Sequence, residues 1–465
     1  MSSGGFALAR TPPGPPRPDR AKPAPGFSLW RLEIRHLLTG RAWLGLAVIL
    51  SLLVGSTFAK AVGIFTEGSR AALTSPDLAQ GMNPFDGVLG PTFGSAYLVA
   101  TLLLPFVAIR QIGADRESGA LKLLLGLGCS PLQVVVKKFT VLVMAWAIYL
   151  LVPLSAALLW SRSGGHLVGT ELGGLLLGHF LYGTVVIALS LLAGSLGRSS
   201  ATSSLLVLAA TLGSWVIDFE GATGGGWLSR LAALSLTQAL RPFEQGLLPV
   251  GHVLAWSAFI PVALGLAAGW LHPGHRMLHK VLLSVGGVAA VLLIFLATPR
   301  FQRSWDLTED RRHSFPSGVE NTLSRIRGRL DIEVRLSAED PRWMDLDKGI
   351  LRKLRHVMPH VSVVRTGDPS TFGRYGQGGD DHYGEVVYRY QGREGLSRST
   401  SAEEILPLIW DLTGAHPWAE DPEAAYPGYP KALDAPLGTL WFRLLLPLLF
   451  LALWLQQHLS LPKAV

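Results

Sequence analysis

The 465-residue sequence has little charge and almost no cysteine, and each shortage excludes a class of protein. Only 16% of the residues are charged and 49% are hydrophobic. Mean hydropathy is +0.34, which is above the usual range of soluble domains. The single cysteine, Cys129, excludes a disulfide within one chain and a multi-cysteine metal cluster. The composition therefore predicts an integral membrane protein.

The sequence also lacks the short motifs of common catalytic sites. It contains no phosphate-binding loop of the G-x-x-x-x-G-K-[ST] type, no G-x-S-x-G elbow and no H-E-x-x-H pair. The glycine-rich stretch 221–226 has no lysine, so we interpret it as a flexible connection. We therefore expect no catalytic residue, no bound cofactor and no ATP hydrolysis by this chain alone.

Histidines are the remaining candidates for a metal site or a proton pathway. His272, His275 and His279 lie close together in the sequence, but an interfacial position accounts for them more simply than a metal does. His179 lies within an apolar run, where polar groups usually face the protein interior. A packing role for His179 is favoured over transport, and no metal site is predicted.

Eight apolar runs are long enough to cross a membrane, which takes about 20 residues of helix. They lie near 42–62, 92–110, 139–160, 172–194, 201–217, 251–271, 281–298 and 437–458. The last two flank a long polar segment, residues 299–436. The sequence thus predicts an α-helical polytopic membrane protein of about eight spans, with one inserted extracytoplasmic α/β domain.

Lysine and arginine are unevenly distributed among the short connections, and this predicts the orientation. With the N-terminus inside, the inner connections and tails carry 16 basic residues and the short outer loops carry four. Cytoplasmic loops of membrane proteins show this excess. We therefore expect both termini in the cytoplasm and residues 299–436 outside. The basic surplus indicates orientation and not nucleic-acid binding.

The N-terminal region contains two further features. Residues 1–27 are rich in proline and basic residues and have no apolar stretch, so they predict a disordered cytoplasmic tail and no secretion signal. Apolar and basic residues then alternate at helical spacing, and they include Trp30, Arg31, Ile34, Arg35 and Leu38. This pattern predicts an amphipathic helix lying against lipid in the inner interface. The alternative is an inward extension of the first span.

The polar segment 299–436 alternates between helical and strand patterns. Residues 330–337 (LDIEVRLS) alternate strictly, as in a half-buried strand, and 385–398 predict a hairpin turning at Gln391-Gly392. Ser401 and Glu404 have the spacing of a capping box. Interleaved helices and strands predict a small α/β domain, followed by a linker over 415–436.

The inner loop 110–138 has more pattern than a plain connection requires. Its expected features are a helix cap at Asp115, a turn at Ser118-Gly119, an apolar ridge over 120–125, and a cap at Ser130 with Pro131 in the first helical position. This order predicts a short amphipathic helix held flat against the inner membrane face. An ordinary helical hairpin is the simpler alternative.

This loop resembles the connection between the second and third helices of ABC-2-type transporter permeases. The likeness lies in ESGAL at 117–121, the ridge, Ser130-Pro131 and Lys137-Lys138, and with the layout of spans it covers about 28–271. The resemblance implies a subunit that pairs with a second copy and binds a separate cytoplasmic ATPase, which holds the ATP and Mg²⁺. It places the ATPase contact at Asp115, Arg116, Glu117, Ser118, Gly119, Leu121, Leu124, Ser130 and Pro131.

A second resemblance covers roughly 281–436. The stretch WDLTEDRR at 305–312 is similar to the auxiliary subunit of gliding-motility-type ABC transporters, as is 384–400. The residues that carry the first likeness are Trp305, Asp306, Leu307, Thr308 and Arg311. The resemblance implies a periplasmic domain fused to the permease, shorter than is usual in that family, with a possible periplasmic partner.

Three functions are compatible with these patterns. An ABC-2-type exporter subunit is favoured because a shaped inner loop has no use in a mere anchor. The alternative is an envelope scaffold whose outer domain binds a periplasmic or cell-wall partner without transport. A proton-driven transporter is disfavoured because carboxylates at membrane depth are nearly absent, and Glu171 and Asp218 lie near the ends of spans.

Overall fold

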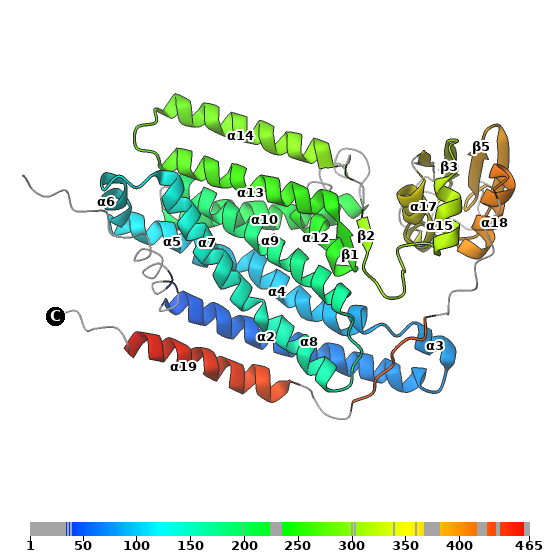
Figure 1. The fold of residues 1–465 in the computed structure, drawn as a ribbon, viewed down its shortest axis with the longest axis horizontal. Helices are drawn as coiled ribbons and strands as arrows, with labels where there is room; N and C mark the ends of the chain where they lie inside the picture. Colours follow the sequence, from blue (N-terminus) through cyan, green and yellow to red (C-terminus); the bar gives the residue numbers. More distant parts are fainter. Residues whose placement is uncertain are drawn as a thin grey trace, which may run out of the picture.

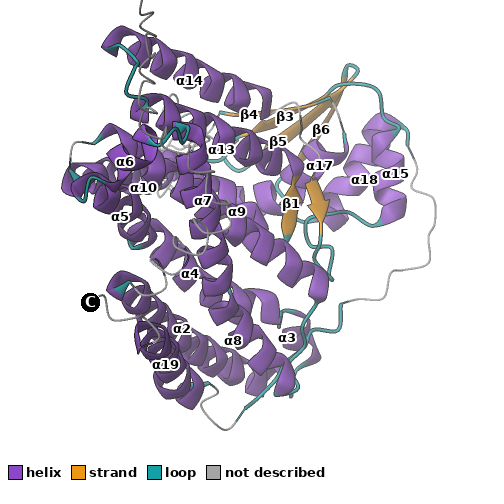
Figure 2. Ribbon diagram, turned by 60° about the vertical axis from the view of Figure 1, so that its left-hand side comes forward, coloured by secondary structure: helices purple, strands orange, loops and turns teal. Residues whose placement is uncertain are grey.

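The computed structural model describes residues 34, 37, 40–197, 199–223, 235–298, 301, 304–337, 340–358, 360–366, 382–415, 426–433 and 438–459. These residues form a helical bundle and a smaller unit that contains a sheet (Figures 1 and 2). The chain leaves the bundle after α14 (Met277–Ala297), builds the sheet unit, and returns to the bundle as α19 (Leu446–Leu459).

The bundle contains most of the helices. They are α2 (Arg41–Ala72), α3 (Pro76–Gln80), α4 (Gly90–Leu102), α5 (Leu104–Glu117), α6 (Ala120–Gly126), α7 (Pro131–Tyr149), α8 (Leu151–Arg162), α9 (Gly169–Leu196), α10 (Ser200–Thr223), α12 (Leu236–Glu244), α13 (Val250–Leu271), α14 and α19. Within the described ranges, seven helical segments are long and apolar enough to cross a membrane: Arg41–Ala72, Phe85–Glu117, Pro131–Arg162, Gly169–Leu196, Ser200–Asp218, Val250–Leu271 and Met277–Ala297. A polytopic membrane protein has this architecture.

The predicted eighth span, 437–458, is shorter than the other seven. Its apolar helix covers Trp441–Gln457 and begins with a π-helical turn. The segment nevertheless belongs to the bundle, because Phe442 is fully buried and its carbonyl accepts a hydrogen bond from Ser51 Oγ at 2.8 Å. Phe442 also occupies the space where Gly55 would carry a Cβ. The estimate of about eight spans is therefore corrected to seven full-length helices and one shorter apolar helix.

The second apolar segment extends well beyond the predicted 92–110. It begins with a π-helical turn at Phe85–Leu89 and continues through α4 and α5 to Glu117. Pro105 lies in the first turn of α5, where a missing backbone N–H is tolerated. Gly119, with φ of 75°, is the first residue that reverses the chain. Asp115 therefore lies inside α5, and the predicted helix cap at Asp115 is wrong.

Helix α9 occupies the centre of the bundle and packs against α5, α7 and α13. Glycines on its surface allow close approach: Phe243 lies against Gly178, and the indole of Trp146 lies against Gly183. Trp146 Nε1 donates to the carbonyl of His179 at 3.1 Å. The side chain of His179 is fully buried in this packing.

The sheet unit contains a four-stranded sheet of order β4-β3-β5-β6. Its strands are β3 (Leu330–Val334), β4 (Val361–Arg365), β5 (Val386–Tyr390) and β6 (Arg393–Ser397), and its helices are α15 (Ser317–Ser324), α16 (Pro341–Leu346), α17 (Arg352–Val357) and α18 (Ala402–Thr413). Strands β3 and β4 are parallel and are joined through α16 and α17, whereas β5 is antiparallel to both β3 and β6. The predicted hairpin is confirmed, because Gln391 and Gly392 both adopt positive φ in a two-residue turn.

A second, two-stranded sheet connects the sheet unit to the bundle. Strand β2 (Ser304–Asp306) pairs antiparallel with β1 (Leu247–Pro249), which lies between α12 and α13. The hydrophobic core of the sheet unit begins only at Phe315. Residues 304–314 therefore pack with the bundle, although the sequence assigns them to a domain that starts at 299.

Several predicted features lie outside the described residues. The tail 1–27 and Trp30, Arg31, Arg35 and Leu38 of the predicted interfacial helix are among them, whereas Ile34 is described and is helical. In the linker 415–436, residues 426–433 are described. At the start of α18, Ser401 Oγ accepts from the backbone N–H of Glu403 at 3.2 Å. Ser401 is thus a cap, as predicted, but through the residue before Glu404.

The sheet unit has its own hydrophobic core, which runs from Phe315 to Leu412 and contains no bundle residue. We therefore predict that residues 315–415 fold alone in aqueous buffer and unfold cooperatively in urea, as followed by circular dichroism. Leu354 is fully buried in this core, so Leu354→Ala should lower the free energy of unfolding by about 2–5 kcal/mol. A fragment that needs detergent or lipid to become structured would contradict this prediction.

Candidate functional site

The two opposite ends of the bundle carry different parts of the chain (Figure 1). Helix α6, the start of α2 and the end of α19 lie at one end, which we call the α6 end. The sheet unit and α3 lie at the other end, which we call the unit end. The two resemblances seen in the sequence, around 115–131 and 305–311, fall at these two ends.

At the α6 end, the charged residues of the predicted ATPase contact tie α5 to its neighbours. Asp115 Oδ2 lies 2.6 Å from Nζ of Lys138 on α7, and the Lys138 side chain is only 2% exposed. The guanidinium of Arg116 donates to the carbonyls of Gly194 at 3.0 Å and of Gly197 at the end of α9. A cation at a helix C-terminus satisfies open carbonyls and interacts favourably with the helix dipole.

The turn after α5 is built from residues with the required backbone freedom. Ser200 Oγ, at the start of α10, donates to Oε1 of Glu117 at 3.3 Å. Gly119 and Gly128, on either side of α6, both have positive φ. Ser130 and Gln133 form a reciprocal capping box at the start of α7, with Pro131 in the first turn. The predicted cap at Ser130 is confirmed.

Helix α6 itself presents apolar side chains to the outside. Leu121 is buried and Leu124 is partly buried, whereas Leu123 is 65% and Leu127 is 73% exposed. The exposed leucines, Leu123 and Leu127, are not among the predicted contact residues, whose leucines Leu121 and Leu124 face inward. The loop therefore has two parts. The charged residues fix the base of the loop to α7, α9 and α10, and the exposed leucines form a protruding apolar ridge. An apolar projection on a rigid base is typical of a protein contact surface.

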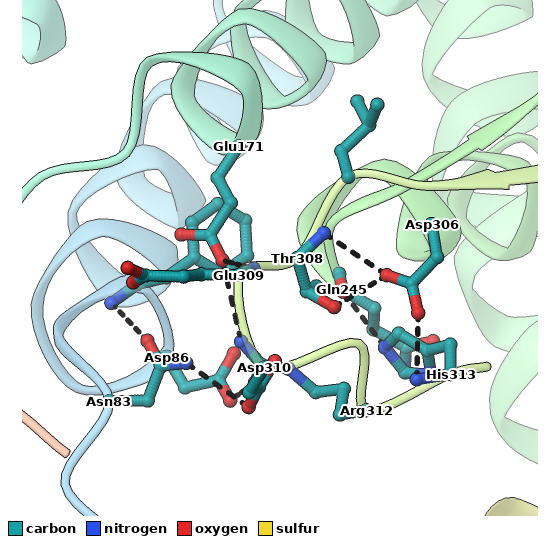
Figure 3. A network of polar contacts seen from close by, with 12 residues as sticks. Asn83, Asp86, Glu171, Gln245, Asp306, Thr308, Glu309, Asp310, Arg312 and His313 are labelled. Carbon is teal, nitrogen blue, oxygen red and sulfur yellow. Dashed lines mark hydrogen bonds and ion pairs between the residues drawn. The ribbon is translucent and has the colours of Figure 1, made fainter. Parts of the chain in front are cut away.

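At the unit end, Asp306 organises the loop that follows β2 (Figure 3). Its carboxylate accepts hydrogen bonds from the backbone N–H groups of Thr308 and His313, each at 3.0 Å, and from Ser314 Oγ at 2.9 Å. The Thr308 hydroxyl adds a further bond at 2.5 Å. One carboxylate thus closes the loop 306–314 on itself.

Leu307 and Thr308 pack this loop against the bundle. The backbone N–H of Leu307 donates to the carbonyl of Gly246 at 2.9 Å. The Leu307 side chain fills the space that Gly174 of α9 leaves open, and the methyl group of Thr308 does the same at Gly246, whose φ is +80°. A Cβ at Gly174 would displace only the end of the Leu307 side chain, whereas Gly246, with its positive φ, requires glycine.

Charged groups reinforce the same contact (Figure 3). Glu171, in the first turn of α9, is only 4% exposed and accepts the backbone N–H of Glu309 at 3.0 Å. The guanidinium of Arg312 pairs with Asp86, lies 3.1 Å from Asp310, and lies 4.0 Å from Glu171. Burial lowers the pKa of Arg312 from its ordinary value, which measures how far this cation is withdrawn from water.

The chain returning from the sheet unit is held at the same place. Tyr429 donates its hydroxyl to Glu309 at 2.9 Å, and His166 Nε2 lies 2.7 Å from the other oxygen of Glu309. The rings of His166 and Tyr429 stack at 3.4 Å. The backbone N–H of Tyr429 also donates to the carbonyl of Met82 at 2.9 Å. Glu309 therefore links the segment that leads into the sheet unit to the segment that returns from it.

A cavity of about 420 Å³ lies where bundle, loop and sheet unit meet. Its lining includes Asp86, Gln245, Arg312, His313, Gly349 and Arg352. Among the residues that the structure describes, no group of histidine, cysteine and carboxylate side chains could hold a metal ion.

The sequence prediction identified the right segment at the unit end but not all the right side chains. Asp306, Leu307 and Thr308 carry contacts, whereas Trp305 is exposed. Arg311, which the resemblance singled out, donates to Ser317 within the sheet unit at 3.3 Å. Its neighbour Arg312 makes the bridge to the bundle. A buried carboxylate at Glu171 signals the need for a cation, but the sequence cannot rank two adjacent arginines.

His313 should make this contact sensitive to pH. Its Nε2 lies 2.9 Å from the carbonyl of Gln245, and burial lowers the pKa of His313 below its ordinary 6.5. Docking therefore favours the neutral ring. The contact should be complete above about pH 6.5 and weaken as the pH falls from there toward the lowered pKa. Hydrogen exchange of 304–314, corrected for intrinsic rates, should rise in that window.

The matched control is His313→Gln, which keeps a donor for Gln245 but does not titrate. Exchange in this variant should lose the part of the pH response that His313 contributes over the same window. Because His166 remains in both proteins, the comparison isolates His313. An identical pH profile in the variant and the parent would contradict the assignment.

Comparison with known proteins bears on the first of the two ends. No curated protein and no solved structure matches the chain. Residues 27–217 match the family model described as ABC-2 family transporter protein. The matched range runs from before α2 into α10, includes α6, and covers less than half of the chain. It does not reach the sheet unit, whose likeness to an auxiliary subunit stays a prediction. The match supports a permease of the ABC-2 transporter family, a membrane subunit rather than an enzyme.

Proposed function

We propose that this chain is the membrane permease subunit of an ABC-2-type exporter, driven by a separate cytoplasmic ATPase that binds ATP and Mg²⁺. The match of residues 27–217 to the ABC-2 family carries the proposal. Permeases of this family generally work with a cytoplasmic ABC ATPase. We further propose that two copies of the chain pair in a bacterial inner membrane.

The α6 ridge is the proposed contact for the ATPase. Leu123 and Leu127 are exposed at the tip of the loop. The base of the loop is tied to α7 through Lys138, to the end of α9 through Arg116, and to the start of α10 through Glu117. A push on α6 would therefore reach three helices directly. No catalytic residue is needed for this role, because the work is a shift between two bundle arrangements.

The proposed orientation places the α6 end in the cytoplasm and the sheet unit outside. The excess of basic residues on inner connections supports it. The fold is compatible with it, because the start of α2, the α6 loop and the end of α19 all lie at one end of the bundle (Figure 1). In this orientation the sheet unit is available to a periplasmic partner.

The first test concerns the ridge. Leu123→Asp places a charge at an exposed position, so the variant should insert and purify normally. Protein purified from host membranes should carry several-fold less Mg²⁺-dependent ATP hydrolysis activity than the parent. Leu73→Asp is the matched control, because Leu73 is 64% exposed at the opposite end of α2. Its recovered activity should equal that of the parent. Equal recovery with all three proteins would refute the ATPase contact at α6.

We propose that the sheet unit acts as a relay and is not a passive appendage. Both of its connections are fixed to the bundle: β2 pairs with β1, and the returning chain bonds through Lys431 N–H to Ser69 Oγ at 2.8 Å. A scaffold domain would need one tether only. Movements of the helices would therefore reach the unit from two sides.

The second test removes the sheet unit but keeps the segments that attach it to the bundle. Replacing 317–414 by a short Gly/Ser bridge leaves the loop 304–314 and the returning residues 426–433 in place. The relay predicts that the complex with the ATPase still assembles, but that stimulation of ATP hydrolysis by substrate or periplasmic partner is lost. If stimulation persists at the parental level, the relay is wrong. If no stimulation exists in the parent protein either, the scaffold alternative gains support.

A further inference from the structure

A cavity of about 370 Å³ opens at the α6 end between the start of α2 and the second half of α5. Its lining includes Gly40, Arg41, Trp43, Arg110 and Gln111. It is separate from the α6 ridge and from the contacts at the unit end. A space of this size can hold a group as large as a phosphate with its substituents.

The charge of the cavity is of one sign. Arg41 and Arg110 both line it, and none of the described residues of its lining is acidic. Within the described part of the chain, neither guanidinium has an ion-pair partner. Glu67, the one acidic residue of α2, lies near the other end of that helix, and Asp115 is already paired with Lys138. Two unpaired cations beside one cavity favour an anion.

The backbone at the start of α2 also favours an anion. Helix α2 begins at Arg41, after the N-cap Gly40, and no side chain caps it. The first N–H groups of a helix have no partner within the helix, and the helix dipole adds positive potential there. A helix of 32 residues presents this end to the cavity.

Gln111 is an independent sign of a ligand. Its side chain is only 9% exposed and lines the cavity, yet no hydrogen bond to it exists in the described structure. Its amide group is therefore free to bond a molecule that occupies the cavity. Its N–H₂ group and the two guanidinium groups together supply several donors to one space, as recognition of a phosphate requires.

The depth of the cavity indicates the source of the phosphate. Trp43 stacks on Tyr149 with ring centroids 4.2 Å apart, and the Tyr149 hydroxyl donates to the carbonyl of Trp43 at 2.9 Å. This buried pair fixes the start of α2 against α7, and α2 continues from Arg41 as an apolar span, so the cavity lies at one end of that span. Basic pockets between helices at this level bind anionic lipid head groups.

We propose that this cavity binds the phosphate of an anionic membrane lipid, with Arg41 and Arg110 as the charged contacts and Gln111 as a neutral donor. The site does not depend on the ATPase contact. Free phosphate has the same chemistry, so the test must distinguish the two sources.

The experiment measures the thermal stability of the full chain in a neutral detergent while lipid or salt is titrated in. Phosphatidylglycerol is the probe, phosphatidylcholine is the zwitterionic control, and inorganic phosphate represents the soluble source. We expect a saturable rise in Tm with phosphatidylglycerol only. Arg41→Gln with Arg110→Gln should weaken the apparent affinity about thirty-fold, given roughly one order of magnitude or less for each basic contact.

Two further variants separate a specific site from general attraction. Lys60→Gln removes a cation from the exposed surface of α2, far from the cavity, and should leave the titration unchanged. Gln111→Glu keeps the size of the side chain but adds a negative charge, and should abolish the rise in Tm. An equal response of the double-arginine variant and the parent would overturn the proposal, as would the absence of any response in the parent. A response to inorganic phosphate of equal size would overturn the lipid assignment.

Discussion

The bundle depends on one helix, α9, which is held at both ends by charged groups from other parts of the chain. At its C-terminus, Arg116 of α5 donates to the last carbonyls. At its N-terminus, Glu171 receives the N–H of Glu309 and lies near Arg312. Arg116 and Glu171 each have the sign that the helix dipole favours at their end. A helix of 28 residues spans about 42 Å, so α9 joins the two ends of the molecule as one rigid element.

This arrangement explains why buried charge is tolerated at the unit end. Removing a carboxylate from water costs several kcal/mol, more than the roughly 0.3–2 kcal/mol that a helix dipole returns. Glu171 is stable there because the loop 306–314 adds a backbone donor and a cation. The loop and α9 depend on each other, so the sheet unit is fixed to the central helix and not merely to the surface.

The features that the sequence predicted well are local ones. The apolar runs, the cap at Ser130 and the turn at Gln391-Gly392 are each determined by a few neighbouring residues, and spacing is enough to find them. The contacts that position the sites are long-range. Arg116 and Gly194 are 78 residues apart, and Arg312 and Asp86 are 226 apart. Pairing between residues so far apart in the sequence depends on how the helices pack, and the periodicity of apolar residues does not predict it. The error at Asp115 has the same origin, because a helix that leaves the apolar layer continues until a residue such as Gly119 reverses it.

Helix α5 connects the lipid cavity with the proposed ATPase contact. Arg110 and Gln111 line the cavity, and Arg116 caps α9 six residues further on, about 9 Å along the axis. An anion bound between α2 and α5 would hold α5 against α2, and a push on α6 would act on the same helix from its other end. Occupancy of the cavity would thus favour one position of α5, and with it one position of α9 and of the loop that Glu171 holds. Only a ligand that binds one of two arrangements more tightly can shift the balance between them. The cavity satisfies this condition if α5 moves relative to α2, because its two arginines belong to different helices.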